Sequence, residues 1–319
     1  MKLKITRPRD WIQRLLPRRS VAGVVGVVVA NRRIALVHLL PPGRSTGTAQ
    51  AAFCVQAAFS DEAQRDALLQ GWVSAQGLRL ARTVLVLEPH GFDLVQMERP
   101  KTAPEAEWPA LLRWKLKDAV DYPASEAVLD VFQMPEGRHG GQQRSVYVAA
   151  AQRERLQQLT AMLQSASLHP RRIDIAPLAL RSLFETCTPP AESIGVVQLS
   201  PEGSLLYILR GETFFVSRAL NLRTQQLAEP DLEQRMQLAD QLALDIQRTM
   251  DYYDAQFGQS PVRQMYFLGG GAAAVWLIEA VQGLLGVVTP SLDLTPLGCT
   301  AEGDLLPLAL GGALEGLRA

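Results

Sequence analysis

The chain alternates apolar runs with short polar breaks, and the same pattern occurs twice. Residues 21–40 read VAGVVGVVVANRRIALVHLL, with a polar break at residues 31–33 between two apolar runs. Residues 194–220 repeat this pattern, with turns predicted at residues 200–203 and 210–211. Short apolar runs rich in β-branched residues and separated by turns are typical of β-hairpins. Two hairpin starts about 170 residues apart therefore predict a duplicated α/β unit.

Apolar residues at spacings of three and four predict three helices, over residues 104–121, 152–166 and 231–257. The third helix has Asp231 as a suitable N-cap and Gly258 as a suitable stop. The first helix is expected to start at a proline and to bury one apolar stripe. Its members are Trp108, Leu112, Leu116, Ala119 and Val120.

The order of these elements predicts a domain plan. Residues 1–20 form a basic leader, residues 21–190 a first half and residues 191–319 a second half, with the boundary near the two prolines of residues 186–193. The strand-like segments RTVLVLE, AVLDVFQMP and RSVYVAAA lie between the two hairpins. The first half is therefore expected to contain an inserted module, at about residues 80–170.

Charge is unevenly distributed along the chain. The leader has seven Lys and Arg residues and one Asp, a net +6, so the remainder carries −6 because the whole chain is neutral. A negative body argues against nucleic-acid binding. The leader also holds apolar residues, a pattern compatible with weak adsorption to anionic lipid or with a mobile, solubilising terminus.

Other composition features point to a cytoplasmic protein without a metal site. The longest strongly apolar run, residues 21–30, is half of the ~20 residues that a spanning helix needs. Three widely spaced cysteines exclude a complete disulfide framework and suit a reducing cytoplasm. The four histidines share no metal-ligand spacing, and no phosphate-binding loop or nucleophile elbow of a standard kind occurs.

One glycine-rich loop is a candidate binding element. Gly269, Gly270, Gly271 and Ala272 follow a predicted strand and precede a predicted helix. Glycine allows the backbone to approach a ligand closely, and a helix start suits a phosphate or a sugar hydroxyl. The loop therefore predicts either a nucleoside cradle or a tight strand-to-helix turn.

Several segments resemble the PilM family of type IV pilus assembly proteins, closest to the MshI branch that serves mannose-sensitive haemagglutinin (MSHA) pili. They include LLRWKLKDAVDYPASEAVLDVFQMP, LALDIQRTMDYYDAQF, FLGGGA and the closing LPLALGGALEG, and the resemblance covers roughly residues 21–319. It implies an actin-like fold of two ribonuclease-H-like halves, with ATP or ADP in the cleft between them. It also implies a protein at the inner face of the inner membrane that binds the N-terminal tail of a PilN-like membrane protein.

The acids that such a cleft uses to hold Mg²⁺ and orient water are replaced in this chain. The positions that usually carry them hold Val28, Gln198 and Ala176, and Asp174 lies two residues before the last. We therefore expect no ATP hydrolysis, and nucleotide binding stays an open alternative. Any remaining affinity is expected at the adenosine side, where Gly269–Ala272 match the pattern.

Trp114, Arg113 and Lys117 are the candidate partner-binding residues. Trp114 lies about 200° around the predicted helix from the apolar stripe, beside cationic residues. It is therefore either exposed, as at a binding hot spot, or packed under a neighbouring element of the module.

Two other functions remain open. The first is the cytoplasmic part of a type II secretion protein of the GspL kind, which has the same scaffold. The second is an ATP-dependent enzyme of the same superfold, such as a sugar kinase, which needs the acids that are replaced here.

Overall fold

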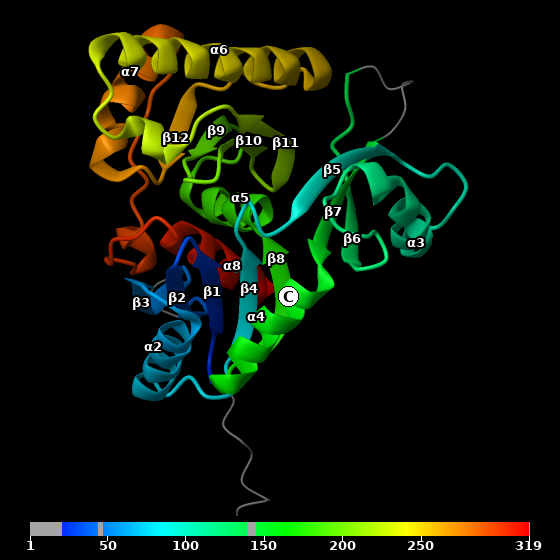
Figure 1. Cartoon of the computed structure of the whole chain (residues 1–319), viewed down its shortest axis with the longest axis vertical. Coiled ribbons are helices and arrows are strands. Elements are labelled where there is room, and N and C mark those ends of the chain that lie inside the picture. The colour runs from blue at the N-terminus through cyan, green and yellow to red at the C-terminus, as the bar shows by residue number, and fades with distance from the viewer. Residues whose placement is uncertain (1–20, 44–46, 139–144, 319) are drawn as a thin grey trace, which may run out of the picture.

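The computed structural model describes residues 21–43, 47–138 and 145–318. Its first large sheet has the strand order β3-β2-β1-β4-β8 (Figure 1). The strands are β1 Val24–Ala30, β2 Arg33–Leu40, β3 Gln50–Ala58, β4 Arg82–Leu87 and β8 His169–Ile175. The β1–β2 turn uses positive φ at both Asn31 (50°) and Arg32 (56°), which is the turn geometry that matches the twist of a two-residue hairpin. The first predicted hairpin is thus confirmed.

Helices cover both faces of the first sheet. On one face lie α2 (Glu62–Ala75) and α4 (Arg153–Ser165), which enclose the core of Val27, Leu36 and Leu85. On the other face lie α5 (Ala176–Cys187) and α8 (Leu306–Arg318). Helix α8 can approach the sheet because Gly26 has no side chain: a Cβ there would lie 1.9 Å from the carbonyl oxygen of Ala309.

The second large sheet repeats the order of the first as β11-β10-β9-β12. Its strands are β9 Ser193–Gln198, β10 Ser204–Arg210, β11 Thr213–Leu220 and β12 Gln264–Leu268. In both sheets an antiparallel three-stranded meander is joined by a parallel fourth strand beside its first. The predicted duplication of the hairpin unit is confirmed by this shared order.

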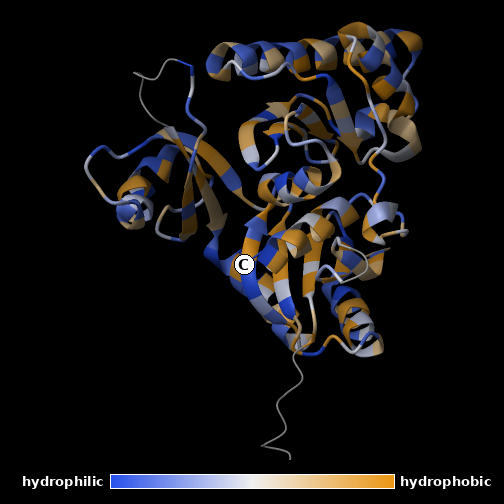
Figure 2. Ribbon diagram, turned by 180° about the vertical axis from the view of Figure 1, so that it is seen from behind, coloured by the Kyte–Doolittle hydropathy of each residue, from blue (hydrophilic) through white to orange (hydrophobic). Residues whose placement is uncertain are grey.

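Helices α6 (Leu232–Phe257) and α7 (Val275–Leu285) cover the outer face of the second sheet, and α5 lies on its inner face (Figure 1). Helix α6 matches the prediction: Asp231 caps it through Gln234, and Gly258 ends it with φ 59°. Short 3₁₀ turns complete this half at η3 Thr224–Leu227, η4 Gly271–Ala274 and η5 Thr295–Leu297. Figure 2 shows the strands mostly in hydrophobic colours and α6 with mixed ones, as expected for a helix with one face in water.

A third, smaller sheet projects from the side of the first half (Figure 1). Its order is β5-β7-β6, with β5 Asp93–Glu98, β6 Ala127–Gln133 and β7 Ser145–Gln152. The inserted module was predicted over about residues 80–170. Both ends of that range, β4 and β8, belong to the first large sheet, so the module is shorter than predicted. The hydroxyl of Tyr147 on β7 donates to the carbonyl of Phe215 at 2.9 Å and so ties the small sheet to the second half.

The prediction of one continuous α-helix over residues 104–121 is wrong. The chain forms η1 (Glu105–Glu107), a short α3 (Trp108–Leu112) and a second 3₁₀ segment, η2 (Arg113–Asp118). The stripe of Trp108, Leu112 and Leu116 is buried as predicted, whereas Ala119 is exposed. Both helix types place residues three or four apart on one side, so the pattern alone could not distinguish them.

In the part of the chain that the structure describes, no helix is long and apolar enough to cross a bilayer. The leader falls outside the described residues, and so does the prediction made for it. Cys54, Cys187 and Cys299 are free thiols.

Candidate functional site

The carboxyl ends of β1, β4, β9 and β12 meet between the two large sheets, where ligands bind in many α/β proteins. They enclose a cavity lined by, among others, Asn31, Glu88, Gln198, Ser200, Gly269 and Asp304. Its volume is about 20 Å³. That is room for about one water molecule, whereas ligand pockets have volumes of roughly 300–1,000 Å³. The cavity is therefore smaller than a typical ligand pocket.

Direct contacts between protein groups occupy the space around this cavity. Arg33 on β2 pairs with Asp304 at 2.8 Å, and Gln56 on β3 donates to the same carboxylate at 2.9 Å. From the other side, the imidazole Nε2 of His90 lies 3.0 Å from the carbonyl oxygen of Gly203 in the β9–β10 turn. The Asp304 contacts thus lie on the first-sheet side of the cavity, and the His90–Gly203 contact joins the first half to the second.

Two of the three replaced acid positions do not face the cavity at all. Val28 and Ala176 are fully buried in the core that lies against α8. Gln198 does line the cavity, and its side-chain carbonyl oxygen is buried without a hydrogen-bond partner among the described residues. The neutral side chains at these positions leave no carboxylate to hold Mg²⁺ there.

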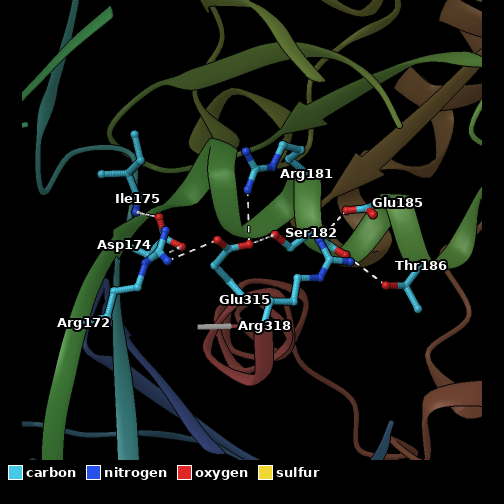
Figure 3. Close-up of polar contacts among 9 residues, drawn as sticks. All are labelled: Arg172, Asp174, Ile175, Arg181, Ser182, Glu185, Thr186, Glu315 and Arg318. Atoms are coloured by element: carbon cyan, nitrogen blue, oxygen red, sulfur yellow. Dashed lines mark hydrogen bonds and ion pairs between the residues drawn. The ribbon is translucent and has the colours of Figure 1, made fainter. Parts of the chain in front are cut away.

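Asp174 does not take over the missing role. Its side chain is buried, accepts a hydrogen bond from the backbone N–H of Ile175 and lies beside Arg172 (Figure 3). Burial raises its pKa, against the opposing effect of the Arg172 charge. Because it points toward α8, it is not part of the cavity lining.

Glu88 is an acid of the cleft that the sequence analysis did not identify. It follows β4 directly and is buried, and its carboxylate accepts from the backbone N–H of His90 at 2.9 Å and pairs with Arg155 at 3.1 Å. Burial raises its pKa, and the His90 N–H and Arg155 oppose that shift. The sequence did contain a signal for it, because Glu88 is an acid at the end of the apolar strand RTVLVLE and is followed by a proline.

Glu202 lies in the β9–β10 turn near Glu88. Partial burial acts to raise its pKa, but hydrogen bonds from Ser200 and Asn31 lower it overall. The Ser200 hydroxyl donates to this carboxylate at 2.7 Å. Both acids are thus engaged by other groups of the protein.

Gly269 is the residue of the Gly269–Ala272 loop that lines the cavity, and packing accounts for two of the loop's glycines. Gly269, Gly270 and Gly271 all have positive φ, at 86°, 75° and 53°. A Cβ on Gly269 would lie 2.5 Å from the carbonyl oxygen of Leu199, and one on Gly270 would lie 2.7 Å from the Cβ of Ala274. Only Gly271 faces open space. These contacts support the tight-turn interpretation, and nucleoside binding by the loop stays a prediction.

Hydrogen bonds and ion pairs join helices α5 and α8 (Figure 3). Glu315 of α8 accepts from the hydroxyl of Ser182 on α5 at 2.7 Å and pairs with Arg181 and Arg172, each at 3.2 Å. Burial acts to raise the pKa of Glu315, but Ser182 and the arginines lower it overall. This cluster therefore joins α8 to α5 and β8.

Trp114 lies on the surface of the small module, which excludes the interpretation that it packs inside. Its side chain is 71% exposed, with Lys115 Nζ 5.7 Å from the ring centroid. It borders a depression of about 400 Å³ that is also lined by Arg99, Lys101 and Leu111. An aromatic anchor between cationic and apolar groups is a common composition for a peptide-binding hot spot.

Arg113 and Lys117 do not join Trp114 in this depression. The guanidinium of Arg113 donates to the carbonyl oxygens of Ala124 and Ala127 at 2.9 and 2.6 Å, so it holds the module together. Lys117 is exposed but does not line the depression. Arg99 and Lys101, which do line it, come from the segment after β5 and were not predicted because they are distant in sequence.

Among the described residues, no group of three His, Cys, Asp or Glu side chains is arranged to hold a metal ion.

Comparisons with known proteins give the fold a class. No protein-family model and no curated protein sequence matches the chain. Solved structures do match. A chain of the PilM–PilN type IV pilus biogenesis complex is 21% identical, with a TM-score of 0.70 over 93% of this chain and 99% of that one. The cytoplasmic domain of EpsL, an inner-membrane component of the type II secretion system of Vibrio cholerae, is 14% identical, with a TM-score of 0.51 over 92% and 95%.

A Bacteroides thetaiotaomicron protein of unknown function with an actin-like ATPase fold is 9% identical, with a TM-score of 0.52 over 89% of this chain and 98% of that one. The chain thus has the actin-like ATPase fold, as predicted.

Proposed function

We propose that this chain is a cytoplasmic scaffold of type IV pilus assembly, of the MSHA kind, and not an ATPase. In this role it binds the N-terminal tail of a PilN-like protein of the inner membrane. The observation that carries the proposal is an actin-like fold whose cavity at the strand ends has a volume of about 20 Å³ and holds Gln198 where an acid is expected. Its acids, Glu88 and Asp304, are already paired with arginines. A fold of this class with such a cavity is suited to binding other proteins.

The kind of partner follows from the fold comparison and from the module surface. The structure with a TM-score of 0.70 is that of a PilM–PilN complex, which makes a PilN-like tail the first partner to test. Trp114 and the depression beside it offer an exposed aromatic anchor with Arg99 and Lys101 at its edge. A short tail could bury Trp114 without opening the cleft.

Type II secretion is the second candidate, because the cytoplasmic domain of EpsL shares the fold over nearly the whole chain. The same module surface would then serve a different inner-membrane partner.

The test is a direct binding measurement with two synthetic peptides. One is the N-terminal cytoplasmic tail of a PilN-like inner-membrane protein from the same organism, and the other is the same residues in scrambled order. We expect the native tail to bind with a Kd in the micromolar range, about −8 kcal/mol, and the scrambled peptide to bind at least tenfold more weakly. Equal affinity for the two peptides, or binding that requires Mg²⁺ and ATP, would refute the proposal.

A further inference from the structure

The end of the first sheet that lies opposite the cleft is formed by two loops that are bonded together. Strands β1, β4 and β8 run parallel, so all three begin at this end (Figure 1). The backbone N–H of Leu80, just before β4, donates to the carbonyl of Ser167, just before β8, at 2.7 Å. His169 N–H in turn donates to the carbonyl of Ala81 at 2.9 Å. The two loops therefore make one continuous surface.

This surface carries uncompensated positive charge. Arg79, Arg82 and Arg171 are all exposed, and among the described residues none of their side chains has an ion-pair or hydrogen-bond partner. The sequence contains no Asp or Glu in residues 67–87 or in residues 155–173.

The nearest acids on the elements packed against this end are already neutralised. Asp174 and Glu315 lie with Arg172 and Arg181 in the cluster behind the cleft (Figure 3). The charge of the three exposed arginines is therefore not cancelled from that side.

An apolar side chain stands among these arginines. Leu80 is 52% exposed and has a φ of 65°. A left-handed backbone is unfavourable for a residue such as leucine, and Asn or Gly would normally occupy it. Nothing in the fold of this loop requires a leucine, since the bond to Ser167 uses only the backbone N–H.

We propose that this end of the first half is a contact surface for anionic membrane lipid. Arg79, Arg82 and Arg171 would face the phosphate groups, for which the planar guanidinium is well suited. Leu80 would enter the apolar edge of the interface. A leucine that is about half exposed among these arginines distinguishes such a surface from one that only attracts an acidic peptide.

The start of the described chain supports the same partner. Val25 pairs with Thr83, so the chain enters β1 beside the start of β4. The residues before it, 1–20, carry a net charge of +6 by sequence. A basic segment in the same chain adds to the attraction of a negatively charged leaflet. This inference does not depend on the partner peptide, because it concerns a different surface.

The experiment is co-sedimentation of the full chain with vesicles of phosphatidylcholine alone, or with about 30% phosphatidylglycerol added. We expect binding only to the anionic vesicles, and weaker binding at higher salt. Replacing Arg82 and Arg171 together by Gln should weaken binding about 20-fold, since each arginine near such a surface contributes about fivefold. The matched control replaces Arg218 and Arg248, two exposed arginines of the second half, by Gln and should change binding less than twofold.

A second variant separates lipid contact from folding. Leu80→Asn suits the left-handed backbone better than leucine does, so the melting temperature should stay the same or rise while vesicle binding falls. The proposal is overturned if the chain binds neutral vesicles equally well, if it binds neither kind, or if the two arginine pairs behave alike. It is also overturned if polyglutamate binds the chain and depends on Arg82 and Arg171 while the vesicles do not.

Discussion

Replacing Trp114 by alanine is expected to abolish most partner binding without unfolding the protein. The side chain is 71% exposed in the free chain. A buried tryptophan removes up to about 250 Å² from water, so full enclosure by a partner would bury about 180 Å² more. At about 25 cal/mol per Å² this contributes about 4 kcal/mol. Binding also fixes the side chains of Trp114, Lys115 and the tail in one conformation. This loss of conformational freedom reduces the binding free energy by about 0.5–1.5 kcal/mol per side chain. A net loss of about 2 kcal/mol, or about a 30-fold increase in Kd, is therefore expected.

The assay is fluorescence anisotropy with a labelled tail peptide, together with a thermal melt of each variant. Met236→Ala is the matched control, because Met236 is a 61% exposed apolar residue on α6, in the other half. Its Kd should match that of the unmodified chain. For Trp114→Ala the melting temperature should stay within a few degrees. If instead the protein unfolds and binding follows only the folded fraction, or if Met236→Ala weakens binding as much, the reasoning about this surface is wrong.

Three further predictions concern the cleft and the helices behind it. First, the purified chain should show no ATP turnover, because Gln198 stands where an acid is expected and the cavity acids Glu88 and Asp304 are paired with arginines; a rate of about 1 s⁻¹ that is lost in Gln198→Ala would contradict this. Second, Gly26→Ala should destabilise the fold by roughly 1–3 kcal/mol, since its Cβ would clash with α8, whereas Gly71→Ala in α2, which meets open space, should stabilise it by up to about 1 kcal/mol; urea melts that rank the two variants in the opposite order would refute the packing argument. Third, Glu315→Gln should lower stability at pH 7 by roughly 1.5–3 kcal/mol, the contribution of a hydrogen bond to a charged group. Because the folded-state pKa of Glu315 is lowered, its stabilisation is complete above the ordinary value of 4.5 and is lost as the pH falls through the folded value. The difference between the two proteins should therefore shrink below about pH 4, and a difference that is constant with pH would show that the carboxylate charge is not involved.

The halves of the fold could be predicted because their strands are continuous apolar runs. Val24–Ala30 and its counterpart in β9 are buried on both faces, so their hydrophobicity shows in the sequence without any knowledge of their neighbours. Helix α6 was equally clear because its cap at Asp231 and its stop at Gly258 are local features. All of these elements could therefore be predicted from features within their own segments of sequence.

The contacts around the cavity could not be predicted, because they join residues that are far apart in sequence. Arg33 meets Asp304 across 271 positions, and no local pattern marks either of them. The same holds for the Trp114 surface, where Arg99 and Lys101 arrive from a different segment of the module. Arg113 was misassigned for a related reason: a cationic residue beside an exposed tryptophan gives no sign that two carbonyl groups already bind it.

The position of α8 has a consequence for how the protein is made. This helix, from Leu306 to Arg318, packs against β1, β2 and β4, so the core of the first half includes residues that are synthesised after the second sheet. Until they emerge, one face of the first sheet has no cover, although its strands were synthesised early. The first half therefore cannot finish folding before the second half exists, unlike domains that fold in order from the N-terminus. During synthesis the valine-rich strands of β1 and β4 are candidates for chaperone binding.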